Sequence, residues 1–235
     1  MEFTCIGTSS RGNCYLIKTD GSNILLDAGV PLRKIVKEIN LNDLSFAFIS
    51  HEHKDHAECM NSLDYRGVQV VYGGITKEWR KIKINRNFKG NMYTFGVEHG
   101  ETICNGCIIE TKEDTILYIT DFNICKWDLS MFNFTTIIIE CNFIEEKITQ
   151  EMIDSNPKYK RQINTHLGLE GLLTFLSHLK LDKCNEIILT HASTDERIYD
   201  QQEAMIRVFS RFLKPVGVCQ TKGGVEWFGK DEFEI

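Results

Sequence analysis

The chain has 235 residues, a length typical of one large domain, and we expect a single domain over 1–235. Its hydrophobic content of 42% can fill a sizeable core, which excludes a disordered or fibrous chain. The 27 Lys and Arg residues against 33 Asp and Glu give a formal net charge of −6, which disfavours non-specific coating of long nucleic acid by the whole surface.

The start of the chain indicates a cytoplasmic protein. Residues 1–7 have neither the basic region nor the long apolar stretch of a signal peptide. No run approaches the roughly 18 apolar residues that span a bilayer, so no membrane partner is expected. The nine cysteines are odd in number and scattered, which indicates reduced thiols.

Short apolar runs bounded by turn residues predict strands. The first two lie at 3–6 and 15–18, on either side of the small polar loop 7–13, and a third follows at 24–26. Apolar residues at helical spacing then predict a helix at 32–39. Further strands are expected at 46–49, 68–72, 92–95, 116–119, 137–139 and 187–189, and helices at 169–179 and 202–213. This alternation indicates an α/β fold in which helices cover sheets.

Four of these apolar runs lead into residues that can bind a metal ion. The run 46–49 leads to the segment His51-Glu52-His53-Lys54-Asp55-His56. The runs 92–95, 116–119 and 187–189 lead to His99, Asp121 and His191. Ligands of open α/β sheets lie at the carboxyl ends of strands, so we expect the four segments to converge.

The segment 51–56 is the densest group of potential ligands. His51 and His53 share a side of an extended segment, while Asp55 and His56 begin the next expected helix and can face a second ion. Three imidazoles and a carboxylate suit Zn²⁺, Mn²⁺ or Fe²⁺. The alternative is a polar surface loop. However, four of its six positions are potential ligands, and it holds three of only seven histidines.

The motif His51-x-His53-x-Asp55-His56, followed by His99, Asp121 and His191, resembles the metallo-β-lactamase superfamily over essentially the whole chain. The segments 8–14 (TSSRGNC) and 25–29 (LLDAG) are similar to a narrower branch, the WalJ (YycJ)-like phosphodiesterases and nucleases. The resemblance implies a four-layer αββα sandwich, an α/β fold with two mixed β-sheets flanked by helices.

The resemblance also implies two divalent metal ions, with zinc as the first expectation and manganese or iron as alternatives. One ion would be held by His51, His53 and His99, and the other by Asp55, His56 and His191. Asp121 would bridge both ions, with a hydroxide shared between them. Asp55 is also a candidate catalytic residue, and Asp27 would orient the metal-binding loop from behind.

Several of these residues also have simpler explanations. An isolated histidine such as His99 is more often a polar surface group, and Asp121 could cap a turn. The order of His99 and Asp121 along the chain favours a role as metal ligands.

His166 is the second candidate catalytic residue, because phosphodiesterases of this superfamily use a histidine in this interval to protonate the leaving group. Its alternative is local hydrogen bonding at the start of the following helix. Asn105-Gly106, between two cysteines, predicts a hairpin turn rather than half of a zinc ribbon.

Two basic stretches and one polar loop indicate an anionic substrate. The stretches are 77–89 and the segment just before His166, although a solvated helix face explains 77–89 equally well. The loop offers phosphate-binding groups from Ser9, Ser10, Arg11 and Asn13. We therefore expect a metal-dependent hydrolase that cleaves phosphodiester bonds of DNA, RNA or a smaller nucleotide through the metal-bridging hydroxide. The alternative is an acyl hydrolase of the thioesterase or lactonase type. The sequence does not define an oligomeric state.

Overall fold

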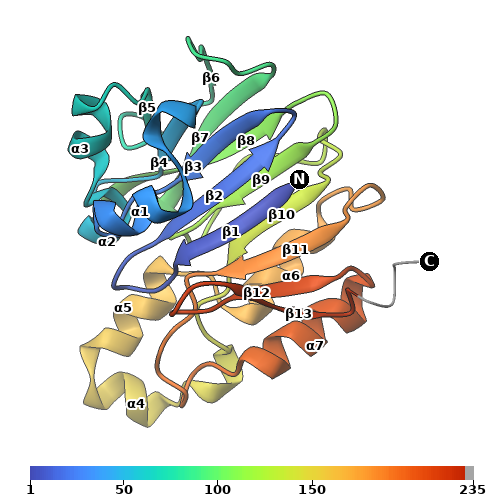
Figure 1. Ribbon diagram of the computed structural model, residues 1–235. Coiled ribbons are helices and arrows are strands. Elements are labelled where there is room, and N and C mark those ends of the chain that lie inside the picture. Colours follow the sequence, from blue (N-terminus) through green and yellow to red (C-terminus); the bar gives the residue numbers. More distant parts are fainter. Residues whose placement is uncertain (231–235) are drawn as a thin grey trace.

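The computed structural model describes residues 1–230 and contains two β-sheets stacked face to face (Figure 1). The smaller sheet has five strands in chain order: β1 (Glu2–Gly7), β2 (Cys14–Thr19), β3 (Ser22–Leu26), β4 (Phe46–Ile49) and β5 (Val70–Tyr72). The first three strands pair antiparallel, and β3, β4 and β5 pair parallel. This sheet is therefore mixed.

The larger sheet has eight strands in the order β13-β12-β11-β10-β9-β8-β7-β6. Their bounds are β6 Arg80–Ile82, β7 Asn91–His99, β8 Thr102–Glu110, β9 Thr115–Ile119, β10 Thr136–Glu140, β11 Glu186–Thr190, β12 Val216–Cys219 and β13 Val225–Phe228. Strands β9 to β12 run parallel, and both edges of the sheet are antiparallel. The carboxyl ends of β9, β10 and β11 therefore meet at one end of the sheet.

Helices cover the outer face of each sheet. On the smaller sheet lie α1 (Leu32–Glu38) and α3 (Met60–Tyr65), with the single turn α2 (Lys54–Ala57) leading into α3. On the larger sheet lie α6 (Leu169–Ser177) and α7 (Gln201–Phe212). The pair α4 (Gln150–Ser155) and α5 (Pro157–Thr165) projects from one corner of the molecule (Figure 1). The four-layer αββα arrangement expected from the sequence is confirmed.

Three layers of apolar side chains hold the four layers together. Alternate residues of a strand face opposite sides, so each strand contributes to two layers. In β2, Leu16 packs with Ile35 of α1, whereas Ile17 lies between the two sheets. In β10, Ile138 lies between the sheets and Ile139 packs in the layer beneath α6 and α7. Both faces of these strands are buried, which explains their uninterrupted apolar sequences.

Two local predictions are wrong. Asn105 and Gly106 lie in the middle of β8, where Gly106 pairs with Phe95, and the β7–β8 turn lies at Gly100-Glu101 instead. A Cβ atom at Gly106 would lie 2.6 Å from the Phe95 ring, so glycine is needed there for close packing and not for a turn. The segment 77–89 contains β6 and no helix, so a solvated helix face does not explain its charges.

Within residues 1–230, no helix is both long enough and apolar enough to cross a membrane.

Candidate metal centre

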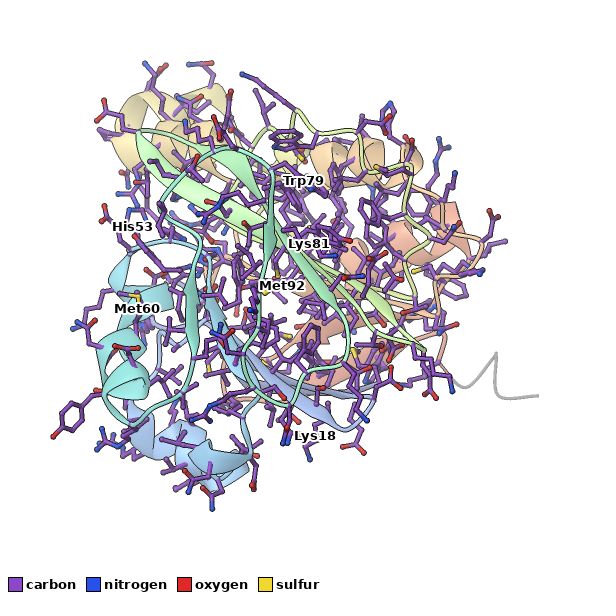
Figure 2. The ribbon with its side chains drawn as sticks, turned by 90° about the horizontal axis from the view of Figure 1, so that it is seen from above. Lys18, His53, Met60, Trp79, Lys81 and Met92 are labelled. Atoms are coloured by element: carbon purple, nitrogen blue, oxygen red, sulfur yellow. The ribbon has the colours of Figure 1, made fainter. Side chains whose placement is uncertain are left out.

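The candidate ligands meet at one end of the two sheets. β4 is followed by Ser50 and His51, β9 by Thr120 and Asp121, and β11 directly by His191. His99 is the last residue of β7, which extends four residues beyond the expected run. Figure 2 shows another candidate, His53, at the same end of the molecule as Met60 of α3 and well away from Trp79 and Lys81. The expected convergence of strand ends is therefore present in the fold.

Three of the strand ends continue into a left-handed backbone conformation. Asp27, Asp121 and His191 have φ angles of 55°, 49° and 51°. This conformation costs a non-glycine residue about 1–2 kcal/mol, and such strain is concentrated at functional sites. Asp or His at these three positions, where glycine would be unstrained, therefore lowers the stability of the fold.

Asp121 lies between two groups of ligand atoms. Its Oδ2 lies 3.8 Å from Nε2 of His51 and 3.5 Å from Nε2 of His99. Its Oδ1 lies 3.3 Å from Nε2 of both His56 and His191. The two oxygens of one carboxylate thus face two different pairs of histidines.

One further side chain completes each group. His53 belongs with the first, because its Nδ1 lies 2.9 Å from Nε2 of His51. Asp55 belongs with the second, because its Oδ2 lies 3.5 Å from Nε2 of His56 and 3.7 Å from Nε2 of His191. The structure therefore brings together all seven residues that the sequence suggested as metal ligands, in the division that the resemblance implies.

The donor set fits divalent metal ions. Within each group the ligand atoms all lie within 4.8 Å of one another, and they are imidazole nitrogens and carboxylate oxygens, which suit Zn²⁺, Mn²⁺ or Fe²⁺. Nε2 of His191 is buried and forms no hydrogen bond, although buried polar atoms are normally paired and the carboxylates of Asp121 and Asp55 lie 3.3 and 3.7 Å away. A metal ion would provide the missing partner. These buried His/Asp clusters are consistent with a dinuclear metal site.

Contacts from outside the two groups orient the imidazole rings, as is usual for metal-binding histidines. Nδ1 of His51 lies 3.0 Å from Oγ of Ser50, and Nδ1 of His99 lies 2.8 Å from the carbonyl oxygen of Thr165. In both residues the remaining nitrogen, Nε2, faces Asp121.

Asp27 orients His56 in the same way from a fully buried position. Its Oδ2 lies 2.6 Å from Nδ1 of His56 and accepts a hydrogen bond from the Tyr118 hydroxyl at 2.5 Å. Its Oδ1 accepts a hydrogen bond from the backbone N–H of Ser50 at 2.7 Å. The side chain thus links the ends of β3, β4 and β9 directly behind the candidate ligands.

Nearby carboxylates raise the pKa values of the two histidines in the second group, against the effect of burial. Burial acts to lower the pKa of His191, but the carboxylates of Asp121, Asp55 and Glu140 raise it to about 10. Burial likewise acts to lower the pKa of His56, but Asp121 and Asp27 raise it well above its usual value. This excess of negative charge around buried imidazoles favours cations in the space between them.

Glu140 is a functional candidate that the sequence reasoning missed. It is fully buried at the end of β10, and its Oε1 accepts hydrogen bonds from the backbone N–H groups of Phe122 and Leu167 at 2.9 and 2.8 Å. Its Oε2 lies 3.0 Å from Nδ1 of His166 and 3.4 Å from Nδ1 of His191. Glu140 follows the apolar run 137–139 just as Asp121 follows 116–119, so the same strand-end pattern could have identified it.

The four loop residues expected to bind substrate have different surroundings. Ser9 and Asn13 are buried and bonded to each other, and the Asn13 amide also lies 3.1 Å from Nε2 of His56. Ser10 and Arg11 are exposed. Only the latter two side chains are accessible to a ligand from solvent.

Sequence comparisons match parts of the chain to one family and to two named proteins. The model of the metallo-β-lactamase superfamily matches residues 7–76. Exodeoxyribonuclease YycJ of Bacillus anthracis is 30% identical over 88 residues, which make up 35% of this chain and 33% of that protein. The protein named Probable RNase MJ4 of Methanocaldococcus jannaschii is 40% identical over 62 residues, 25% of this chain and 14% of that protein. The matched regions thus span about a third and about a seventh of these relatives.

A solved structure extends the likeness to nearly the whole chain. The metallo-β-lactamase fold protein YhfI of Bacillus subtilis superposes with a TM-score of 0.70 over 96% of this chain and 98% of its own, at 15% sequence identity. At this identity the likeness shows the fold alone. Together, these comparisons show that the chain has the metallo-β-lactamase fold, and that residues 7–76, which include the segment 51–56, match the model of the metallo-β-lactamase superfamily.

Proposed function

We propose that this metallohydrolase cleaves phosphodiester bonds, in DNA, RNA or a smaller nucleotide. The observation that carries the proposal is the pair formed by His166 and the buried Glu140 beside the ligand groups. The alcohol that leaves a phosphodiester is strongly basic as an alkoxide and needs a proton as the bond breaks, whereas the thiolate that leaves a thioester does not. The His166 imidazole, which Glu140 holds beside the ligand groups, therefore favours phosphodiester over thioester hydrolysis. The similarity to an exodeoxyribonuclease and to a protein named as an RNase supports the same substrate class.

The two ligand groups would hold two divalent ions. His51, His53 and His99 would hold one ion and Asp55, His56 and His191 the other, with Asp121 between them. Bound there, the ions would supply water that ionises near neutral pH and positive charge for the phosphoryl oxygens. Zinc is the first candidate, with manganese and iron as alternatives, because nitrogen and oxygen ligands do not discriminate strongly among these metals.

His166 would donate the proton to the leaving oxygen. Glu140 lies 3.0 Å from its Nδ1, which fixes the ring and leaves Nε2 to carry the transferred proton. The backbone bonds to Oε1 of Glu140 hold that carboxylate in place in turn. Glu140 is therefore a positioning residue for His166.

The loop 9–13 would contribute to both substrate binding and site geometry. Ser10 and Arg11 keep the proposed role of binding a substrate phosphate, because their polar groups are exposed. Asn13 accepts hydrogen bonds from the backbone of Ser9 and from the Tyr15 hydroxyl at 3.1 Å each. Its amide nitrogen donates to the carbonyl oxygens of Ser9 and of Asp55 in α2, at 3.0 and 3.3 Å, so we assign Asn13, together with Ser9, to positioning α2.

The leaving-group dependence of the reaction tests the proposal. Protein reconstituted with Zn²⁺ or Mn²⁺ would be assayed on bis(p-nitrophenyl) phosphate, on an alkyl phosphodiester, on a thioester and on a lactone. We expect phosphodiester hydrolysis that is lost in Asp121→Asn. His166→Gln should reduce cleavage of the alkyl ester by about 10²–10⁴-fold, and that of the p-nitrophenyl ester far less because p-nitrophenolate leaves without a proton. Metal content should stay unchanged in this variant. Thioester or lactone hydrolysis without phosphodiester hydrolysis would instead establish the acyl hydrolase.

A further inference from the structure

A pocket of about 320 Å³ opens beside His166 and His191, on the side of the site where the leaving group would depart. One wall is α5, which contributes Lys158, Arg161 and Gln162. Figure 1 shows α5 below α2 at the edge of the molecule. The opposite wall is the segment after β11. The volume is at the lower end of the range of ligand pockets, about 300–1,000 Å³, and suits one nucleotide rather than a duplex.

The two cations of this pocket are free to bind an anion. Within residues 1–230, neither Lys158 nor Arg161 forms an ion pair or a hydrogen bond through its side-chain nitrogens, and no carboxylate is among the pocket-lining residues. Two other arginines of the protein, by contrast, are neutralised by carboxylates. Arg197 pairs with Asp195 at 2.8 Å, and Arg207 pairs with Glu146 at 3.3 Å as well as with two further glutamates. The pocket therefore carries two uncompensated positive charges on an acidic protein.

A residue that lines the same pocket has a buried acceptor without a donor. Gln162 is only 8% exposed, and its Nε2 donates a hydrogen bond to Oδ1 of Asn142. Asn142 in turn donates to the carbonyl oxygen of His191 at 2.7 Å, which fixes the orientation of both amides. Oε1 of Gln162 then has no hydrogen-bond partner. A ligand that brought a hydroxyl group together with its anionic group would satisfy both features of the pocket.

The two walls are held together before any ligand binds. The Tyr159 hydroxyl of α5 donates a hydrogen bond to Asp195 at 2.9 Å and accepts one from Arg197 at 2.7 Å. Asp195 also accepts a hydrogen bond from Arg197 at 2.9 Å, so the two partners of Tyr159 in the segment after β11 hold each other in place. A subsite with fixed walls loses little entropy when it binds a ligand.

We propose that this pocket is a second anion-binding subsite, which takes a sugar phosphate of the substrate on the leaving-group side of the scissile bond. Lys158 and Arg161 would bind the phosphate, and Gln162 would accept a hydrogen bond from a sugar hydroxyl. The inference rests on the proposed phosphodiesterase function and narrows its substrate to phosphodiesters whose leaving portion carries a further phosphate, such as a nucleic acid strand. Cyclic nucleotides and simple phosphodiesters lack that group.

The test compares two otherwise identical dinucleotides, with and without a phosphate on the leaving nucleotide, using the metal-loaded protein. We expect the phosphorylated dinucleotide to have a KM at least tenfold lower, and this preference to vanish in Lys158→Gln/Arg161→Gln. Lys160→Gln is the matched control, because Lys160 lies on the same helix and does not line the pocket. This control should keep the preference. Calorimetry with ribose 5-phosphate and with inorganic phosphate should show tighter binding of the sugar phosphate, and a loss of that binding only in the double variant.

The outcomes separate the subsite from the proposed function. A wild-type protein that cleaves both dinucleotides with equal KM would overturn the subsite while leaving the phosphodiesterase intact. An equal loss of preference in Lys160→Gln would also overturn it, because the effect would then be general electrostatic attraction. If no phosphodiester is cleaved, the proposed function fails. Ribose 5-phosphate binding that depends on Lys158 and Arg161 would in that case still support the subsite.

Discussion

Gly29 is the position at which a single added carbon should disturb the metal centre most directly. It lies in the turn after β3, where its N–H donates to the carbonyl of Asn13 at 2.9 Å. A Cβ atom at this residue would lie 1.7 Å from the carbonyl oxygen of Asp55 and 2.6 Å from the backbone nitrogen of His56. Real Cβ contacts are essentially never shorter than 3.0 Å, so in Gly29→Ala the backbones of α2 and of this turn must move apart by more than 1 Å.

The displacement should affect both stability and metal binding. Overpacking of this kind costs about 1–3 kcal/mol, which corresponds to a fall in Tm of roughly 2–12 °C for a chain of this size. Asp55 and His56 belong to one ligand group, so its ion should be bound at least about 10-fold more weakly, the lower end of the cost of disturbing a metal site's supporting contacts. We expect dialysed Gly29→Ala protein to retain close to one ion per chain instead of two.

The assay is thermal unfolding together with metal analysis after dialysis. Gly171→Ala is a suitable control, because a Cβ there meets the flexible end of Leu167 at 2.9 Å and alanine is favoured in a helix such as α6. It should keep both ions and the wild-type Tm. A Gly29→Ala protein with two tightly bound ions and an unchanged Tm would refute the argument that α2 is held against this turn.

Three further predictions concern the same region. Asp27→Asn should weaken binding of the ion held by His56 by about 10–100-fold, measured by competition with a chromophoric chelator. Wild-type metal affinity in this variant would show that Asp27 does not act on the His56 imidazole. If free metal is about 1,000 times its Kd, removal of the metal by a chelator should lower the free energy of unfolding by about 4 kcal/mol. The Tm should then fall by about 8–16 °C, and an unchanged Tm would contradict metal binding by the folded protein. Hydrogen bonds from Arg197, then Tyr159, hold the pKa of Asp195 well below its usual value, although partial burial acts to raise it. Asp195 therefore stabilises the fold above the unfolded pKa of about 3.9 and loses this effect as the pH falls toward its folded pKa. In urea unfolding, Asp195→Asn should be less stable than wild type at pH 7, and the difference should shrink below about pH 4; a constant difference would exclude the carboxylate as its source.

The strands that the sequence predicted well are those buried on both faces. β4 has the expected bounds 46–49 because all four of its residues are buried apolar side chains. The strand β8 was misjudged because Asn105-Gly106 is the strongest local signal for a turn, whereas tertiary packing decides that position: Asn105 bonds to the Thr76 carbonyl and Gly106 lies against the Phe95 ring. The short helices α4 and α5 were not predicted, because few of their positions are buried and few of their residues are apolar.

The candidate site was predictable as a set of residues but not as a geometry. The spacing of His51, His53, Asp55 and His56 is local and visible in the sequence. That the two oxygens of Asp121 face different histidine pairs depends on how the two sheets stack, which no local pattern encodes. Glu140 follows an apolar run and could have been identified by the strand-end pattern, but its burial and its contact with His166 are visible only in the structure.

The central claim is that these residues form a two-metal phosphodiesterase that cleaves nucleic acid strands. The most direct measurement is cleavage of end-labelled single-stranded DNA and RNA oligonucleotides by protein loaded with Zn²⁺ or Mn²⁺, beside an Asp121→Ala control. The account predicts cleavage by the wild-type protein that is lost in Asp121→Ala, with a label pattern that reveals the polarity. A protein that carries two ions per chain and leaves both oligonucleotides intact would contradict the claim, as would equal cleavage by the Asp121→Ala variant.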